Sequence, residues 1–385
     1  MLLSLNYGEK FPEKVFIFTF CLVSLFLFYE VIFRLSYRLY HGFSYSKEKR
    51  VNLEKLYVEP HPYIPFVMKP HSLLEDSGAM NLPLHSDRFT SGNFKSNKHG
   101  FLNGINGDRE MLTPKPKGLV RINCIGASTT GNYIVENDKK YSYPLELEKI
   151  LQSKLSKQIE VNNCGQGGYN SADILARTIF QILDTKPDIM ILYHGYNDIR
   201  SYLTPDFKSD YSHSRCNLGE NYWKFGLTGK IPDFNLKFVD YLISKCLAGS
   251  VRNSLLDHIV RGKFDEKADP SNGLMTYKRN IQYLIDLCKA NGVELILSTY
   301  CHFLYEKIKN ETLHLTFHSI VNKENEIIRG LAKKNNLILI DNSILVPADE
   351  EYFVDSIHFT PMGMKLLARN IADVILKNQN YLFKM

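Results

Sequence analysis

From residue 119 onward, short apolar runs alternate with longer segments of helical spacing, and this alternation most limits what the chain can fold into. The apolar runs lie at 120–125, 159–161, 189–193, 293–298 and 337–340. Helices are predicted between them, near 143–155, 171–183, 277–290 and 320–334. Strands that alternate with helices form a parallel sheet covered on both faces. The sequence therefore predicts an α/β domain with a five-stranded parallel sheet.

Composition limits the class of protein further. The 385 residues suffice for one large or two ordinary domains, and 44% apolar with 23% charged residues is typical of a globular protein. The net charge is only +6, and no Lys/Arg cluster resembles a nucleic-acid-binding stripe, so we expect no nucleic-acid partner. The seven cysteines are irregularly spaced without a CxxC pair. Cys124 and Cys164 are therefore expected to be buried free thiols.

Residues 15–33 form an apolar run near the amino terminus. At 1.5 Å per residue this run spans about 28 Å, close to the roughly 30 Å hydrocarbon core of a bilayer. A cleaved signal peptide and a buried core helix are the alternatives. No small-x-small cleavage site follows the run, which favours a retained single-pass transmembrane anchor.

The side of the membrane is left open by the flanking charges. Lys10 and Lys14 precede the run, whereas five basic residues follow it by position 50. This bias would leave the bulk of the chain in the cytoplasm, but it is small, and long domains translocate largely regardless of charge.

The remaining segments divide the chain into parts. Residues 1–14 are a tail, and 34–118 are predicted to be a juxtamembrane and wrapping segment, because 51–118 are rich in Pro, His, Asn and Gly without a sustained period. The main domain covers 119–385 and contains an aromatic-rich insertion at 200–270 that includes Trp223. This insertion is either a substrate wall or lid, or a small helical subcore.

Ser128 is the first candidate for chemistry. The strand predicted from the apolar run 120–125 ends at Gly126, so Ser128 is expected on the loop that follows. Ligands of open α/β sheets bind outside the carboxyl ends of the strands. A Gly-x-Ser tripeptide alone is usually a turn, so the case for Ser128 depends on the other loops.

Two further loops supply hydrogen-bond donors. After the second strand, Gly165, Gly167 and Gly168 allow a backbone N–H to approach a ligand without a Cβ in the way. After the third strand, Asn197 has an amide that can donate to a developing oxyanion. Asp198 either orients this loop or caps the turn.

A histidine and an aspartate occur together near the carboxyl terminus. Asp355 precedes His358 by three residues, with Thr360 as the expected helix N-cap and Pro361 at the first helical position. A histidine that serves as base for a serine needs a group to hold its tautomer and stabilise the imidazolium, and a nearby aspartate can do this.

These motifs resemble the four blocks of the SGNH (GDSL-like) hydrolase family, in family order. The blocks are GASTT with Ser128, NCGQGG with Gly168, GYND with Asn197, and DSIH with Asp355 and His358. The resemblance covers about 119–376, interrupted by the insertion, and upstream PHPY and NKHGF resemble segments of membrane-anchored bacterial members. The chain departs from the family at Ala127, where the GDS motif has Asp; that Asp is not a catalytic group.

The resemblance implies a flavodoxin-like three-layer sandwich and a set of roles. Ser128 would be the nucleophile, His358 the general base and then acid, and Asp355 its orienting partner. The oxyanion hole would consist of the backbone N–H groups of Ser128 and Gly168 and the Asn197 amide, with Gly165 and Gly167 as competitors of Gly168.

Other residues are weaker candidates. His194 could line the site, as could Trp223, although a strand-end histidine is usually satisfied by backbone. His314 and His318 have i, i+4 spacing, yet no carboxylate or cysteine joins them in a recognised metal pattern. We therefore expect no metal. No phosphate-binding glycine motif opens a helix in the right context, so no nucleotide cofactor is indicated, and we expect no cofactor.

Three functions follow as hypotheses. The first is a membrane-anchored serine esterase that hydrolyses an O-acyl ester, on a small molecule, glycan or lipid-linked substrate, through an acyl-enzyme. The second is an O-acyltransferase that uses the same triad and an envelope glycan as acceptor. The third is a catalytically silent glycan-binding or assembly protein that keeps the fold.

Overall fold

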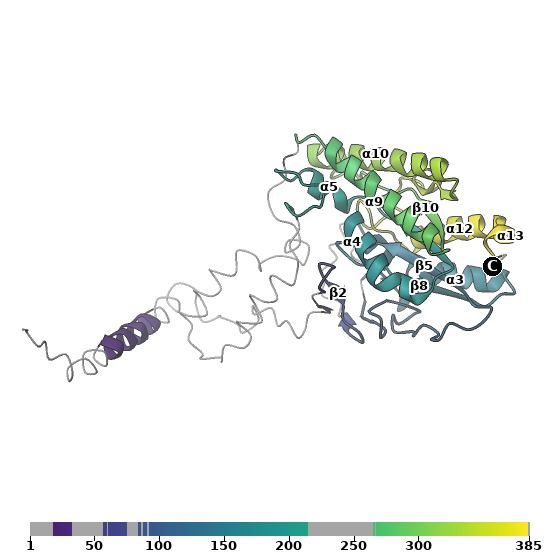
Figure 1. Cartoon of the computed structure of the whole chain (residues 1–385). Coiled ribbons are helices and arrows are strands. Elements are labelled where there is room, and N and C mark those ends of the chain that lie inside the picture. The colour runs from purple at the N-terminus through teal and green to yellow at the C-terminus, as the bar shows by residue number, and fades with distance from the viewer. Residues whose placement is uncertain are drawn as a thin grey trace, which may run out of the picture. The chain divides into compact units, whose positions relative to one another are not determined.

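The computed structural model describes residues 18–32, 57–59, 61–74, 84–85, 88–90, 92–214, 265 and 267–383. The chain divides into two compact units. One comprises Met1–Leu56 and Tyr222–Asn253, in which the described part is a helix over 18–32 (purple in Figure 1). The other comprises Tyr57–Asn221 and Ser254–Met385 and contains the sheet.

The centre of the larger unit is a five-stranded parallel sheet, as predicted. Its strands are β5 (Val120–Gly126), β8 (Ile159–Asn163), β9 (Ile189–Tyr193), β10 (Glu294–Ser298) and β11 (Leu339–Ile340). They lie side by side in the order β11-β10-β9-β5-β8. Counted along the chain, this is the 2-1-3-4-5 order of flavodoxin-like folds. Every residue of the central strands β5 and β9 is buried, as expected for a parallel sheet covered on both faces.

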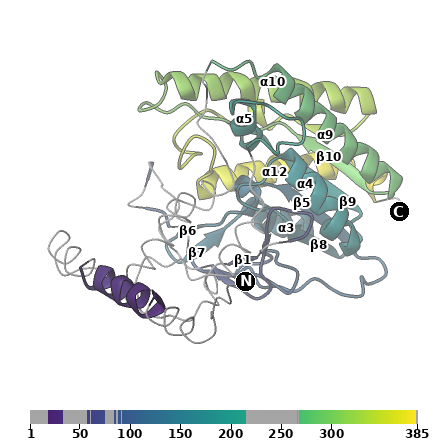
Figure 2. The same cartoon turned by 60° about the vertical axis from the view of Figure 1, so that its left-hand side comes forward.

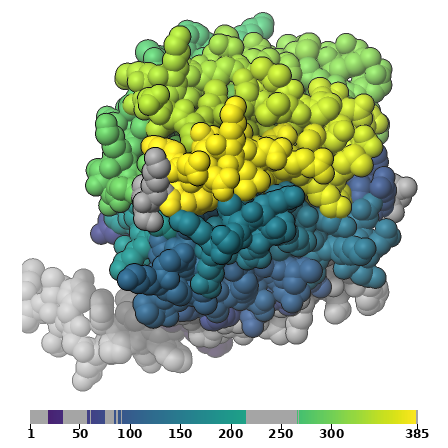
Figure 3. All heavy atoms as spheres, turned by 90° about the vertical axis from the view of Figure 1, so that its right-hand side faces the viewer, coloured from purple at the N-terminus to yellow at the C-terminus, as the bar shows by residue number. Residues whose placement is uncertain are grey.

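Helices cover both faces of this sheet and complete three layers (Figures 1 and 2). On one face α3 (Tyr143–Lys154) packs against α12 (Pro361–Lys377), and Figure 3 shows the yellow carboxyl-terminal region beside the blue-teal part of the chain. On the other face lie α4 (Ser171–Arg177), α9 (Ser271–Ala290) and α10 (Thr312–Asn335). Starting from β5, the next strand in the chain, β8, lies on one side of β5, and the later strands β9, β10 and β11 lie on the other side. Right-handed crossovers therefore place α3 opposite α4, α9 and α10.

Smaller elements complete the unit. The short strands are β1 (Val58–Glu59), β2 (Val67–Met68), β3 (Leu73–Leu74), β4 (Phe94–Lys95), β6 (Ile134–Glu136) and β7 (Lys139–Tyr141), which pair as β1-β2, β3-β4 and β6-β7. The short helices are α2 (Ser128–Gly131), α5 (Asn197–Tyr202), α11 (Asn342–Leu345) and α13 (Gln379–Leu382).

The predicted helices differ from the observed ones mainly at their ends. α9 begins six residues and α10 eight residues before the predicted starts at 277 and 320. The helix predicted over 171–183 is α-helical only to Arg177 and continues as a π-helical turn, Thr178–Ile182, and a 3₁₀ turn, Leu183–Thr185. The Thr178 hydroxyl donates to the Ile174 carbonyl (2.8 Å) at this change, and such side-chain bonds compete with the regular helical ladder.

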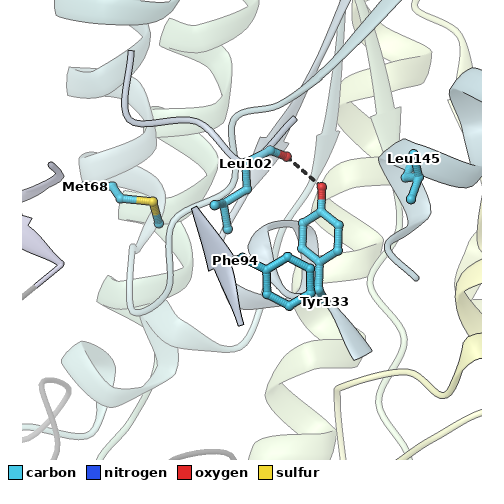
Figure 4. Packing of buried hydrophobic residues seen from close by; sticks show 5 residues of the cluster. All are labelled: Met68, Phe94, Leu102, Tyr133 and Leu145. Carbon is cyan, nitrogen blue, oxygen red and sulfur yellow. Dashed lines mark hydrogen bonds between the residues drawn. The ribbon is translucent and has the colours of Figure 1, made fainter. Parts of the chain in front are cut away.

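Part of the segment predicted to wrap the domain packs into the core of the larger unit. Met68, Phe94 and Leu102 form a buried cluster with Tyr133 and with Leu145 of α3 (Figure 4). The Tyr133 hydroxyl donates to the Leu102 carbonyl at 2.9 Å, so the polar end of the ring is satisfied inside the cluster. Buried residues from this segment thus pack against residues of the sheet domain.

Some predictions concern residues outside the described ranges. Within the described part of the chain, no helix is both long and apolar enough to span a bilayer. The predicted span at 15–33 extends beyond the described helix at both ends, and most of the 200–270 insertion, with Trp223, also lies outside the described residues.

The five cysteines that the structure describes are all free, and Cys124 and Cys164 are buried, as predicted.

Candidate active site

Ser128, His358 and Asp355 meet at the carboxyl end of the sheet. His358 Nε2 lies 2.9 Å from Ser128 Oγ, and His358 Nδ1 lies 2.6 Å from Asp355 Oδ2. Ser128 and His358 are 230 positions apart in the chain, so this convergence is a product of the fold. The three side chains have the geometry of a nucleophile, a base and an orienting carboxylate.

Close backbone packing holds Ser128 at this position. Ser128 is the first residue of α2, directly after β5. A Cβ at Gly126 would lie 2.3 Å from the Tyr193 carbonyl oxygen, and one at Gly165 would lie 2.2 Å from the Gly131 nitrogen. Both glycines are therefore required where β5 and the loop after β8 press against neighbouring backbone.

Both carboxylate oxygens of Asp355 accept hydrogen bonds. Its Oδ1 accepts from the backbone N–H groups of Ile357 and His358, each at 2.7 Å, while Oδ2 faces the histidine ring. Burial acts to raise the pKa of Asp355, but the charge of His358 and these hydrogen bonds outweigh it and hold the pKa below its usual value. Because an ionised carboxylate only accepts, His358 Nδ1 is the donor, and Nε2 is left to accept from the Ser128 hydroxyl.

The predicted helix cap positions the histidine loop. Thr360 is the N-cap of α12, and its Oγ1 accepts from the Gly363 N–H at 3.1 Å, with Pro361 at the first helical position. The same hydroxyl donates to the Glu351 carbonyl at 2.6 Å. The loop that carries Asp355 and His358 is thus fixed to a rigid helix start.

The candidate oxyanion donors flank Ser128. Because β5 lies between β8 and β9, the loops after those strands lie on either side of it. The loop after β8 carries Gly168, at φ +79°, and a Cβ on the adjacent Gly167 would lie 3.9 Å from Ser128 Cβ. Asn197 begins α5 after β9, and its Nδ2 donates to the Tyr169 carbonyl at 2.9 Å. An amide nitrogen carries two N–H groups, so one remains for a substrate oxygen.

A buried glutamate supports the turn before Asn197. Tyr196 has φ +72° and ψ −52°, and the Asn197 N–H donates back to the Gly195 carbonyl at 2.9 Å, which makes a tight three-residue turn. Glu324 of α10 accepts from the Tyr196 N–H (3.2 Å) and the Tyr202 hydroxyl (2.8 Å). Burial, together with the nearby charge of Asp198, raises the pKa of Glu324 to about 8. Sequence reasoning missed Glu324, because a glutamate within an amphipathic helix carries no sign of burial.

His194 does not line the site, which corrects the prediction. Its side chain is fully buried, and its Nε2 lies 2.7 Å from Asp198 Oδ2. His194 directly follows β9, and its imidazole lies in the protein interior against Asp198 of α5. Asp198 therefore has a partner that the sequence did not indicate.

The histidines with i, i+4 spacing do not assemble a metal site in the described residues. His318 Nδ1 lies 2.9 Å from Nδ1 of His302, and His314 lies 3.5 Å from Glu311. No group of three possible metal ligands occurs in the part of the chain that the structure describes. Burial, together with the neighbouring histidines, lowers the pKa of His302 to about 3, so its ring is neutral at physiological pH.

Solved structures with low sequence identity are similar to this chain. A lipase/acylhydrolase from Enterococcus faecalis has a TM-score of 0.41 and 17% identity, covering 67% of this chain and 96% of its own. An acetylxylan esterase from Geobacillus stearothermophilus has a TM-score of 0.40 and 15% identity, covering 66% and 94%. A GDSL-like lipase from Bacteroides thetaiotaomicron has a TM-score of 0.40 and 15% identity, covering 69% and 92%. No curated protein matches the chain in sequence.

A family model provides the assignment. The model of the GDSL-like lipase/acylhydrolase family matches residues 124–366. The match begins in β5, contains the loops of Asn197 and His358, and ends in α12. Because it covers more than half of the chain, the protein belongs to the GDSL-like lipase/acylhydrolase (SGNH) family and is an ester-hydrolysing enzyme.

Proposed function

We propose that the protein is a serine esterase that cleaves an O-acyl ester through a covalent acyl-enzyme, with Ser128 as the nucleophile. The observation that carries this proposal is the continuous contact from Ser128 Oγ through the His358 ring to Asp355, at 2.9 and 2.6 Å. Serine is a weak nucleophile at its own pKa and needs such a base within hydrogen-bond reach.

The reaction proceeds in two half-reactions. As Ser128 Oγ attacks the ester carbonyl, His358 Nε2 takes the hydroxyl proton, and the imidazolium then gives this proton to the leaving alcohol oxygen. The acyl group is now bound to Ser128. A water molecule attacks the acyl carbonyl, His358 takes its proton and returns one to Ser128 Oγ, and the carboxylic acid leaves. Asp355 stays ionised and stabilises the imidazolium in both steps.

The oxyanion is assigned to three donors. The backbone N–H groups of Ser128 and Gly168 and the second N–H of Asn197 would bind the carbonyl oxygen as it becomes negative. The position of β5 between the two donor loops supports this assignment. Each such donor contributes about 10²- to 10³-fold to kcat in serine hydrolases.

The substrate is proposed to be an O-acyl group on a glycan or a lipid-linked molecule, and residues 15–33 are proposed to anchor the enzyme in the membrane. The support is the apolar run itself, together with the exposed large apolar side chains along the helix over 18–32. Charge bias favours a cytoplasmic catalytic domain, whereas family analogy favours an extracytoplasmic one. A reporter that is active on only one side of the membrane, fused after residue 385, decides between them.

A fluorophosphonate probe tests the nucleophile. The full-length protein in detergent is expected to be labelled, and Ser128→Ala is expected to lose all labelling. Ser153→Ala is the matched control, because Ser153 is an exposed serine of α3. Absence of labelling in the wild type, or equal labelling of Ser128→Ala, contradicts the proposal. Products formed from an acyl ester with and without a glycan acceptor then distinguish hydrolysis from acyl transfer.

A further inference from the structure

We infer that Asp198 is a positioning residue of the oxyanion hole, which holds the Asn197 amide in place through a buried clamp between α4 and α5. This inference rests on the proposed function, because it requires Asn197 to bind the oxyanion. Asp198 is fully buried, and its side-chain hydrogen bonds go to Ser171, His194 and Tyr211, none of which is a reacting group of the proposed mechanism.

The Asp198 carboxylate collects four hydrogen bonds from three parts of the chain. Its Oδ2 accepts from the Ser171 backbone N–H at 2.9 Å and lies 2.7 Å from His194 Nε2. Its Oδ1 accepts from the Ser171 hydroxyl at 2.5 Å and from the Tyr211 hydroxyl at 2.8 Å. A fully buried carboxylate that accepts four hydrogen bonds is held in one position, and removing one of its partners costs free energy.

The clamp acts on the atom that orients Asn197. Ser171 is the first residue of α4 and lies two positions after Tyr169, whose carbonyl oxygen accepts from Asn197 Nδ2 at 2.9 Å. Asn197 and Asp198 are the first two residues of α5. These adjacent side chains therefore bind the same short stretch, and the Asp198 contact with Ser171 fixes where the Tyr169 carbonyl lies. When that contact is removed, the Tyr169 carbonyl and the Asn197 amide can shift together.

Charge makes the clamp sensitive to substitution. Burial acts to raise the pKa of Asp198, but the His194 contact and the Ser171 and Tyr211 hydroxyls outweigh it and keep the pKa low. Asp198→Asn keeps the size of the side chain but removes its negative charge, and its amide nitrogen donates where a carboxylate oxygen accepts. The charge-assisted hydrogen bonds from Ser171 and His194 are therefore weakened or lost.

A double-mutant cycle with p-nitrophenyl acetate as the probe ester tests the inference on the full-length protein. Asp198→Asn is expected to lower kcat about tenfold or more, with KM changed less than about twofold, because the interaction is made in the transition state. In an Asn197→Ala background the same substitution is expected to cost less than about threefold, because residues that act through one another are not additive.

Two variants keep the test valid if Asp198→Asn folds poorly. Ser171→Ala removes one bond of the clamp and is expected to lower kcat in the same direction, again less in the Asn197→Ala background. Tyr211→Phe is the matched control, because it removes one hydrogen bond to the same carboxylate but leaves the α4–α5 contact, so kcat should change less than about twofold.

The outcomes separate the two proposals. If Asn197→Ala keeps the wild-type kcat, the oxyanion role in the proposed function fails, and this inference fails with it. If Asn197→Ala lowers kcat while Asp198→Asn and Ser171→Ala cause equal fold losses in both backgrounds, only the positioning role is overturned, and Asp198 is then a stability residue.

Discussion

The two ends of the parallel sheet use charged groups differently. At the amino end, Arg121 Nε lies 2.8 Å from Glu160 Oε1, and both side chains are at most 3% exposed. Arg121 also donates to the carbonyls of Leu112 and Thr185, and Glu160 accepts from the Leu112 N–H at 3.0 Å. At the carboxyl end, His358 Nδ1 lies 2.6 Å from Asp355 Oδ2, but the two side chains are 15% and 20% exposed.

The difference shows where chemistry is possible on this fold. The Arg121–Glu160 pair directs its hydrogen-bonding groups at other parts of the protein and ties the segment around Leu112 to the sheet. The Asp355–His358 pair directs Nε2 at a half-buried serine hydroxyl, and this hydrogen bond can be exchanged for a bond to substrate. The first arrangement can stabilise only, whereas the second can transfer a proton.

The largest expected effect is at the carboxyl end. Ser128→Ala and His358→Ala should each lower kcat for ester hydrolysis by about 10⁴-fold or more, and the double variant should be little worse, because the triad acts as a unit. The free energy of unfolding should change little in either variant. Steady-state kinetics and urea unfolding check both statements, and additive losses on a logarithmic scale would show that the two residues do not cooperate.

The next largest effect is expected at the amino end, where a substitution should lower stability and leave kcat nearly unchanged. Arg121→Met should lower the free energy of unfolding by about 3–5 kcal/mol, because it leaves the Glu160 carboxylate buried and unpaired. The kcat of the folded fraction should stay within about twofold. The double variant Arg121→Met, Glu160→Met should recover most of the loss in urea unfolding. Failure to recover would mean that the pair itself stabilises this end.

Glu324 is a buried ionisable group near the carboxyl end of the sheet, and we expect it to make the free energy of unfolding depend on pH. Its pKa is about 8 in the folded protein against the ordinary 4.5, so only the unfolded state releases this proton between about pH 5 and 8. The stabilising contribution of the protonated carboxyl is therefore present below about pH 4.5 and lost as pH rises toward 8. Between pH 5 and pH 8, the free energy of unfolding should therefore fall more in the wild type than in Glu324→Gln. Glu326→Gln, at an exposed position of the same helix, should follow the wild type; equal slopes in all three proteins would rule out a buried proton at Glu324.

The smallest effect is at the helix cap behind the triad. Thr360→Ala removes the hydroxyl that bonds to the Gly363 N–H and the Glu351 carbonyl, and should cost about 1 kcal/mol of stability. Thr360→Ser keeps the hydroxyl and is the matched control. Thermal unfolding measures both variants, and an unchanged midpoint for Thr360→Ala would mean that the cap does not contribute.

Much of the fold and the convergence of the triad could be predicted from local patterns. The five strands and their covering helices followed from hydrophobic periodicity, and the cap at Thr360 and Pro361 followed from residue types at fixed spacing. The motif order placed Ser128, Asn197 and His358 after strand ends, where a parallel sheet brings loops together. The early starts of α9 and α10 and the π-helical turn after Arg177 were not predicted, because tertiary packing and side-chain bonds override a weak periodic signal there.

The sequence by itself determined the α/β architecture and the chemical groups of the site, because strand and helix periods and the order of short motifs are local properties of the chain. Only the tertiary structure decided that His194 faces inward to Asp198, that Asp198 reaches Ser171, and that Glu324 supports the Tyr196 turn. Whether a polar side chain is buried, and which partner satisfies it, depends on elements that are distant in sequence and meet only when the helices pack on the sheet.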